Sequence, residues 1–248
     1  MQQLPVKLER EPLVDAVFEV RVSVDTSLAD VLPGFLMHKL GGNLPITRLP
    51  AADLPLPVRR QDPKLQFATI LRIEWDNYFI SCGDRNIVII CKLPYPKWPS
   101  FKDAIIEIMS HIAVLKLEGS VERYSLKYIN IIDAGDFADQ IGKISMDVQL
   151  GGIDVTKQQI SLQVHDEVED IVHIYSIVTG AQARSSGGQQ FSGVLVDIDS
   201  IRKVDVPNLS EFAADLESGL DELRKENKQR FFNCLKDTTI EELGAIYE

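Results

Sequence analysis

Apolar and polar residues alternate along the first of four stretches that are predicted as β-strands in the first half of the chain. The last of the four has both kinds of residue on both faces, as a central strand does. These stretches are residues 18–24, 65–75, 78–93 and 121–132, and an interruption is expected in the third near Gly83. Two segments between them instead place apolar residues three and four apart, as an amphipathic helix does. The helical segments are residues 27–40, ended by Gly41 and Gly42, and residues 100–117. The first half therefore reads β-α-β-β-α-β.

Residues 43–63 interrupt this order. They carry five of the twelve prolines, and proline removes a backbone donor and fixes φ. We expect a long, mobile connection there without regular elements.

The second half of the chain is predicted to contain successive strands followed by one long helix. Strands are predicted at residues 144–150, 158–168, 171–179 and 191–198, with a flexible hairpin tip at residues 185–188. Asn208 and Glu211 are typical of a helix start, and an apolar stripe then predicts one long helix over residues 208–235. Hairpins followed by a helix favour an α+β fold. We expect two antiparallel-sheet lobes, residues 1–133 and 134–248, the second a four-stranded sheet followed by the long helix.

Charge separates the same two halves. The chain has 248 residues and a net charge of −11. Residues 1–133 hold 16 basic and 16 acidic residues, whereas residues 134–248 hold 10 and 21, which accounts for the whole excess. An acidic half repels a phosphate backbone, so nucleic-acid binding by that half is not expected. The balanced half can still carry a local basic patch.

Localisation follows from what the sequence lacks. No leader pattern and no apolar run of membrane-spanning length is present. The three cysteines, Cys82, Cys91 and Cys234, are widely spaced and form neither a disulfide framework nor a metal-binding pair. We expect a cytoplasmic protein with reduced thiols and no cofactor.

Four segments together resemble a sporadically distributed family of uncharacterised prokaryotic proteins of about this length. They are residues 11–20 (EPLVDAVFEV), 122–130 (ERYSLKYIN), 194–199 (VLVDID) and 231–247. The resemblance covers the whole chain, although Ser125 and Lys127 stand where the family usually has Gly and Arg. It implies no established activity. Its patchy distribution implies a gene carried in mobile or defence-type loci.

The mid-chain strand offers the best candidate site. Arg123 and Lys127 share one strand face, and a basic pair on a rigid strand can bind a carboxylate or phosphate. Tyr128 and Asn130 complete this candidate anion site. The alternative is structural pairing of the two cations with acidic groups on adjacent strands, such as Glu19 or Glu74.

A second candidate is a metal site. Asp197 and Asp199 lie two residues apart on a predicted strand and point to one face, where two carboxylates can hold a hard cation such as Mg²⁺. His165, with Asp166 and His173, could add ligands. The alternative is that these residues lie on a solvent-exposed face of the sheet. Their spacing matches no known metal-binding motif, so we expect no tight metal site.

Two functions from different classes follow. The preferred one is a non-enzymatic binding or regulatory protein that acts with a partner protein encoded nearby, because an acidic half suits a basic partner. The other is a metal-dependent phosphoester hydrolase using Asp197 and Asp199.

The long helix bears on self-association. A helix of about 40 Å over residues 208–235 exceeds the roughly 15–20 Å width of four strands. An overhanging apolar stripe would predict a homodimer through this helix. The alternative is that the helix bridges both lobes of one chain and buries its stripe internally.

Overall fold

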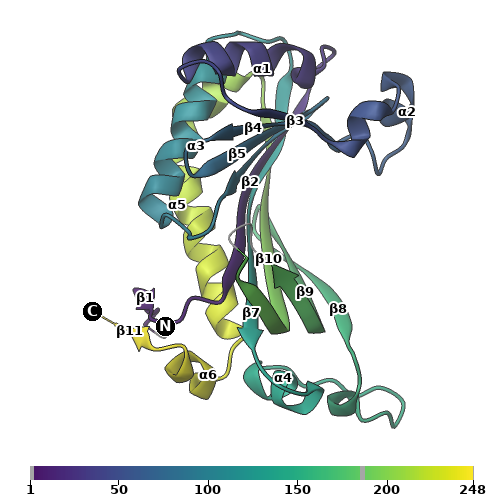
Figure 1. Ribbon diagram of the computed structural model, residues 1–248, viewed down its shortest axis with the longest axis vertical. Coiled ribbons are helices and arrows are strands. Elements are labelled where there is room, and N and C mark those ends of the chain that lie inside the picture. Colours follow the sequence, from purple (N-terminus) through teal and green to yellow (C-terminus); the bar gives the residue numbers. More distant parts are fainter. Residues whose placement is uncertain (1–2, 185–187, 248) are drawn as a thin grey trace. The chain divides into compact units, whose positions relative to one another are not determined.

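The computed structural model describes residues 3–184 and 188–247 and has a mixed α+β fold (Figure 1). Within these residues one sheet has nine strands in the order β3-β4-β5-β6-β2-β7-β10-β9-β8, and β1 pairs with β11 in a second sheet. The strands are β1 (Lys7–Leu8), β2 (Leu13–Ser23), β3 (Ile46–Arg48), β4 (Thr69–Trp75), β5 (Tyr78–Gly83), β6 (Asn86–Cys91), β7 (Ser120–Asp133), β8 (Ser161–Val168), β9 (Ile171–Arg184), β10 (Gln190–Val206) and β11 (Ala245–Ile246).

Six helices and two 3-10 turns accompany the strands in the described residues. They are α1 (Leu28–Lys39), α2 (Leu56–Gln61), α3 (Trp98–Ala113), α4 (Phe137–Lys143), α5 (Leu209–Asn233) and α6 (Asp237–Glu242), with 3-10 turns η1 (Pro50–Asp53) and η2 (Val155–Lys157). Asn208 caps α5 as expected, because its Oδ1 accepts from the Glu211 N–H at 2.9 Å and its Nδ2 donates to the Glu211 carboxylate at 2.8 Å. None of the helices described is both long and apolar enough to cross a membrane.

The chain forms two compact units, and each is assembled from segments that are distant in the sequence. Unit 1 comprises residues 1–16, 127–200 and 224–248, and unit 2 comprises residues 17–126 and 201–223. From the sequence, unit 1 has 11 basic and 19 acidic residues, a net charge of −8, and unit 2 has 15 and 18, a net charge of −3.

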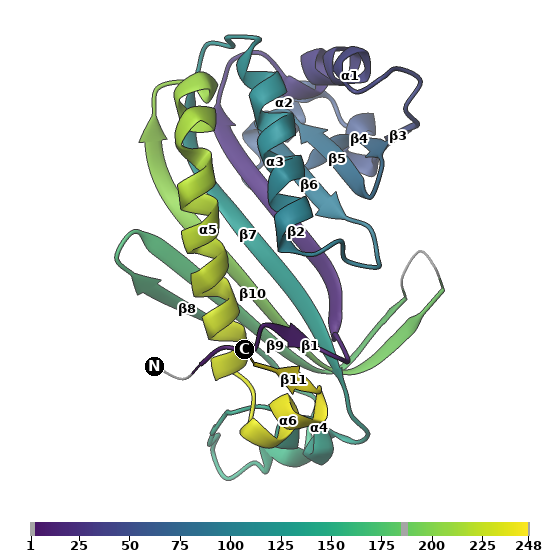
Figure 2. The same cartoon turned by 90° about the vertical axis from the view of Figure 1, so that its left-hand side faces the viewer.

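Unit 2 has its core between its part of the sheet and three helices. Alternate residues of β2 and β5, such as Phe18, Val20 and Ile80, are fully buried, and α1 and α3 lie over this face of the sheet (Figure 1). Residues 209–223 of α5 lie beside α3 (Figure 2), where Lys102 bridges the carboxylates of Glu217 and Asp221.

Unit 1 has a separate apolar core. Its β10 contributes Val194, Val196 and Ile198, none of which is solvent-exposed. Phe231 and Phe232 at the end of α5 pack into the same cluster. The apolar stripe of α5 is thus buried in both units: Leu209, Phe212, Leu216, Leu220, Leu223, Phe231 and Leu235 are each at most 7% exposed. The exposed patch that motivated a homodimer through residues 208–235 does not occur there.

Several expectations need correction. The α+β class is confirmed, but residues 144–150 do not form a strand, because Ile144 instead makes an isolated bridge to Leu235. The α3 helix begins at Trp98, two residues before the expected Ser100. The predicted hairpin tip at residues 185–188 falls almost entirely outside the described residues.

Residues 43–63 are also more regular than expected. They contain β3, η1 and α2, with prolines in the first turns of the helical pieces, where a missing N–H costs nothing. Arg59 fastens this segment, since its Nε donates to Asp84 Oδ2 at 2.8 Å and its Nη2 to Asp84 Oδ1 at 3.1 Å. Both side chains are largely buried, with exposures of 11% and 3%. The buried ion pair between Arg59 and Asp84 therefore anchors a segment that was expected to be an irregular connection.

Candidate functional site

The four residues of the predicted anion site occupy both faces of β7. Arg123 and Lys127 lie on the face opposite the helices, and each is partly exposed. Tyr128 and Asn130 alternate with them and are 3% and 5% exposed. The Tyr128 ring lies 4.1 Å from the Arg224 guanidinium carbon, and Asn130 Nδ2 donates to the Val196 carbonyl at 3.5 Å. Tyr128 and Asn130 therefore cannot contact a ligand held by the two cations.

In unit 2, Arg123 joins an ion-pair cluster on β2. Glu19 Oε2 accepts from Arg21 Nε at 3.0 Å and lies 3.4 Å from Arg123 Nη2, while Glu19 Oε1 accepts from Asn86 Nδ2 at 2.9 Å. Glu19 is one of the two acidic partners considered from the sequence. Because two arginines share one carboxylate, the cluster keeps an excess of positive charge.

The same sheet face carries a third arginine. Direct register pairs Glu19 with Val88, Val88 with Ser81 and Ser81 with Arg72, so Arg72 is about 14 Å across the sheet from Glu19. Among the residues described, Arg72 has no ion pair. Its Nε lies 3.4 Å from Ser81 Oγ, and its guanidinium carbon is 5.0 Å from the centre of the Phe79 ring.

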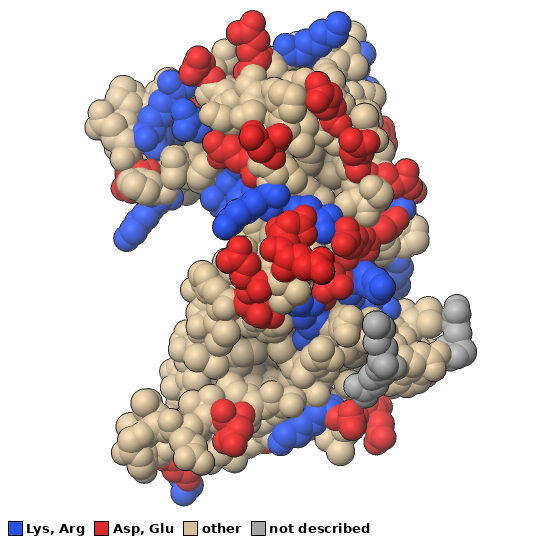
Figure 3. Space-filling model, turned by 180° about the vertical axis from the view of Figure 1, so that it is seen from behind, with Lys and Arg blue, Asp and Glu red and all other residues tan. Residues whose placement is uncertain are grey.

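Aromatic rings support these cations. Arg21 lies 4.0 Å above the Phe67 ring, and Lys92 shares the Phe79 ring at 5.0 Å while pairing with Glu74 at 2.6 Å. Stacking on a ring restricts a long cationic side chain without neutralising it. We call Arg21, Arg72 and Arg123, with Glu19 between them, the arginine face. On the side of the molecule seen in Figure 3, acidic and basic side chains alternate over short distances.

In unit 1, Lys127 pairs with the predicted metal ligand Asp197 at 2.9 Å. Burial raises the pKa of Asp197, and the attraction of Lys127 offsets this only in part. Burial alone would lower the pKa of Lys127, but Asp197, with smaller contributions from Asp199 and Asp15, raises it. Lys127 of the predicted anion site and Asp197 of the predicted metal site are therefore ion-pair partners.

The remaining proposed metal ligands lie elsewhere. His165 is exposed on β8, and β9 lies between β8 and β10 in the sheet. His173 is fully buried, and its Nδ1 lies 2.9 Å from Ser200 Oγ, on the face opposite Asp197 and Asp199. In residues 3–184 and 188–247, no three His, Cys, Asp or Glu side chains gather as a metal ion would require.

We predict that Lys127→Met lowers the free energy of unfolding by roughly 1–2 kcal/mol at pH 7, because it leaves the Asp197 carboxylate buried without its cation. Asp197→Asn in the same chain should recover part of this loss, and a double-mutant cycle from urea denaturation measures the coupling. Lys157→Met, which breaks the exposed pair with Asp154, is the control and should change nothing measurable. If the loss in the double variant equalled the sum of the losses in the two single variants, the pair would not be coupled.

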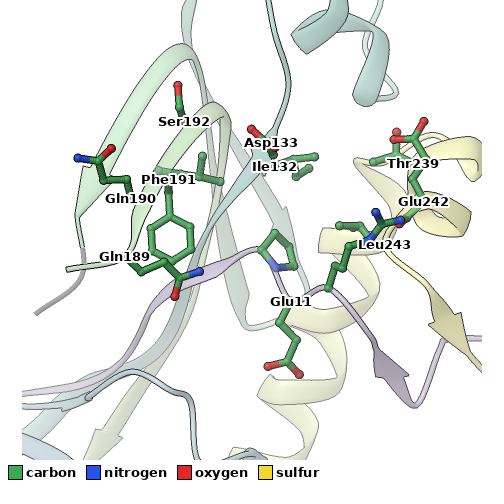
Figure 4. Close-up of a pocket in the computed structure, with 13 residues that line it drawn as sticks. Glu11, Ile132, Asp133, Gln189, Gln190, Phe191, Ser192, Thr239, Glu242 and Leu243 are labelled. Atoms are coloured by element: carbon green, nitrogen blue, oxygen red, sulfur yellow. The ribbon is translucent and has the colours of Figure 1, made fainter. Parts of the chain in front are cut away.

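A cavity in unit 1 escaped prediction. Its volume is about 600 Å³, and Figure 4 shows side chains from four separate segments around it. They include Arg10, Glu11, Asp133, Phe191, Ser192 and Glu242. Residues 11–20 and 231–247 had been singled out by resemblance, but nothing local in the sequence indicates that they meet.

The chain matches no protein-family model, and no curated protein is significantly similar to it. The residues and their geometry therefore carry the argument about function.

Proposed function

We propose that this protein is a non-enzymatic binding or regulatory protein that acts with a partner protein. The arginine face of unit 2 is the contact surface, and it takes carboxylate or phosphate groups of the partner. One observation carries the proposal: Arg72 lies on the same sheet face as two arginines that share one carboxylate, and it has no ion pair among the described residues.

The physical argument is one of preorganisation. A guanidinium that is already stacked on Phe79 loses little side-chain freedom when it binds an anion, so more of the interaction energy appears as affinity. Arginine also presents a planar fork of donors that matches carboxylate and phosphate geometry. Charge complementarity at such a surface mainly sets the association rate and the choice of partner.

The hydrolase alternative has less support. Asp197 is held by Lys127, His165 is two strands away, and His173 points to the opposite face. A phosphoester hydrolase with two metal ions needs converging oxygen and nitrogen ligands that hold the two ions about 4 Å apart. The resemblance to a sporadically distributed family implies a mobile or defence-type locus, and we propose that the partner is encoded nearby.

The experiment uses proteins encoded by the flanking genes as candidate partners. We expect one of them to bind the purified protein with an affinity that falls as salt rises, and Arg72→Glu to weaken that binding at least about tenfold. Lys64→Glu makes the same charge change at an exposed site of unit 2 and should bind like the wild type.

Two results would reject the proposal. One is that Arg72→Glu binds the partner as tightly as Lys64→Glu does. The other is metal-dependent turnover of a phosphoester that Asp197→Asn abolishes in a folded protein.

A further inference from the structure

The cavity of unit 1 has the size of a small-molecule site. Its volume of about 600 Å³ lies within the range of roughly 300–1,000 Å³ typical of ligand pockets. Its walls combine apolar surface from Pro12, Phe191 and Leu243 with polar groups from the ends of β7 and α6 (Figure 4). Such a mixture suits a ligand with an apolar body and a polar head.

The uncommitted charge on these walls is negative. Arg10 donates to the backbone carbonyl of Glu242, and the Glu242 carboxylate accepts from Lys143 at 2.8 Å. Asp133 is exposed at the end of β7 and has no hydrogen bond or ion pair with the residues described. The cavity therefore offers a free carboxylate, whereas its arginine already has an acceptor.

The start of β10 supplies an aromatic ring to the cavity. Phe191 is partly buried, so its ring is fixed yet reachable from the cavity. The adjacent Gln190 and Ser192 are exposed, and in the part of the chain that the structure describes neither side chain has a hydrogen-bond partner. Gln190 and Ser192 alternate with Phe191 along β10 and point to its other face, so the Asp133 carboxylate and the Phe191 ring are the groups that recognise a cation.

We propose that this cavity binds an organic cation: a guanidinium or primary ammonium group carried on an apolar chain. Asp133 forms the ion pair, and the Phe191 ring contacts the face or alkyl part of the cation. This site is separate from the arginine face and takes the opposite charge, so it does not rest on the proposed function. The cation could be a free amine or a basic side chain of a protein, and these share one chemistry.

Calorimetry on the full chain tests the proposal with three probes. They are agmatine, a blocked tripeptide with a central arginine, and the same tripeptide with citrulline, which is neutral but nearly identical in shape. We expect a dissociation constant below about 1 mM for at least one cationic probe and at least about tenfold weaker binding of the citrulline peptide. Equal binding of agmatine and the arginine peptide identifies a free amine as sufficient, whereas binding of the peptide alone identifies a protein side chain.

Matched variants locate the binding. Asp133→Asn should weaken the cationic probe at least about tenfold, and Phe191→Leu should weaken it about threefold while keeping an apolar wall. Asp147→Asn removes the same charge from another exposed position of unit 1 and should stay within about twofold of the wild type. Circular dichroism and thermal unfolding check that each variant folds.

The proposal is overturned if neither cationic probe binds at millimolar concentration. It is also overturned if citrulline binds as well as arginine, or if folded Asp133→Asn binds like Asp147→Asn. Because Arg72→Glu leaves the cavity untouched, its effect on partner binding does not bear on these outcomes.

Discussion

Replacing Asp84 with alanine is expected to lower the free energy of unfolding by about 3–5 kcal/mol, the usual cost of breaking a buried ion pair. The substitution strands the Arg59 guanidinium, which has only 11% exposure and would keep just the carbonyls of Leu54 and Ala51 as partners. It also removes the acceptor of the Ser27 hydroxyl, 2.7 Å away. Urea denaturation followed by circular dichroism measures the loss.

Two further variants make this result specific. Asp53→Ala breaks the pair with Arg48, in which the closest atoms are 4.0 Å apart and both side chains are more than 70% exposed, so little change is expected. Combining Asp84→Ala with Arg59→Met removes both charges and should be less destabilising than Asp84→Ala alone. If Asp84→Ala were no worse than Asp53→Ala, the ion pair would not fasten residues 43–63.

The same pair predicts a dependence on acid. Burial alone would raise the pKa of Asp84, but hydrogen bonds from Arg59 and Ser27 outweigh burial and leave it below its ordinary value. A carboxyl whose pKa is lower in the folded state contributes stability above its unfolded pKa of about 4, and this is lost as the pH falls through the folded value. Asp84→Ala should therefore show a weaker loss of stability below about pH 4 than the wild type.

His173 is expected to make unit 1 sensitive to pH at milder acidity. Burial lowers the pKa of His173 to about 4, with a further decrease from Arg230 and small opposing effects from Glu226 and Asp166. The folded state keeps this imidazole neutral, while the unfolded chain takes up a proton below about pH 6.5. Stability from this residue is therefore complete above about pH 6.5 and declines toward pH 4, by roughly 2 kcal/mol at pH 5 and roughly 3 kcal/mol in full.

The structure gives the reason for the neutral ring. His173 Nδ1 lies 2.9 Å from Ser200 Oγ, which also accepts from Asn227 Nδ2 at 3.0 Å, and the whole group is buried under α5. Urea denaturation at pH 7.5 and pH 5.0 measures the effect. His173→Gln should lose about 2 kcal/mol less than the wild type between these two conditions.

The exposed histidine of the neighbouring strand provides the control. His165→Gln should show the same pH dependence as the wild type, since His165 is on the surface of β8. Parallel behaviour of the His173 and His165 variants would contradict the assignment of the effect to the buried ring.

Local patterns predicted most of the elements but few of their contacts. The alternation around Phe18 and the stripe that begins at Leu209 are properties of single segments, so both elements could be predicted, although β2 begins five residues before the expected strand. The pairing of Lys127 with Asp197 depends instead on β7 lying beside β10, and the order of strands in a sheet leaves no local mark. The sequence could thus identify both candidate residues without indicating that they neutralise each other.

The errors have similar causes. Residues 144–150 resemble a strand in sequence. In the structure the backbone N–H of Ser145 instead donates to the carbonyl of Cys234, just after the end of α5. The prolines of residues 43–63 suggested a connection without regular elements, whereas their positions in first turns are compatible with helix. The cavity depends on the meeting of residues 10–12, 131–133, 189–192 and 239–243, which no single segment encodes.

Each of the two units is built from segments that are distant in the sequence, and this determines what happens when a protease cuts the chain once. A protease that cleaves between Glu169 and Asp170, in the exposed turn after β8, would give fragments of residues 1–169 and 170–248. Each fragment would supply strands to both units, because unit 1 and unit 2 both draw on residues before and after the cut. The nicked protein should therefore migrate as one particle on gel filtration and separate only in denaturant, and the two fragments should reassociate when mixed after refolding.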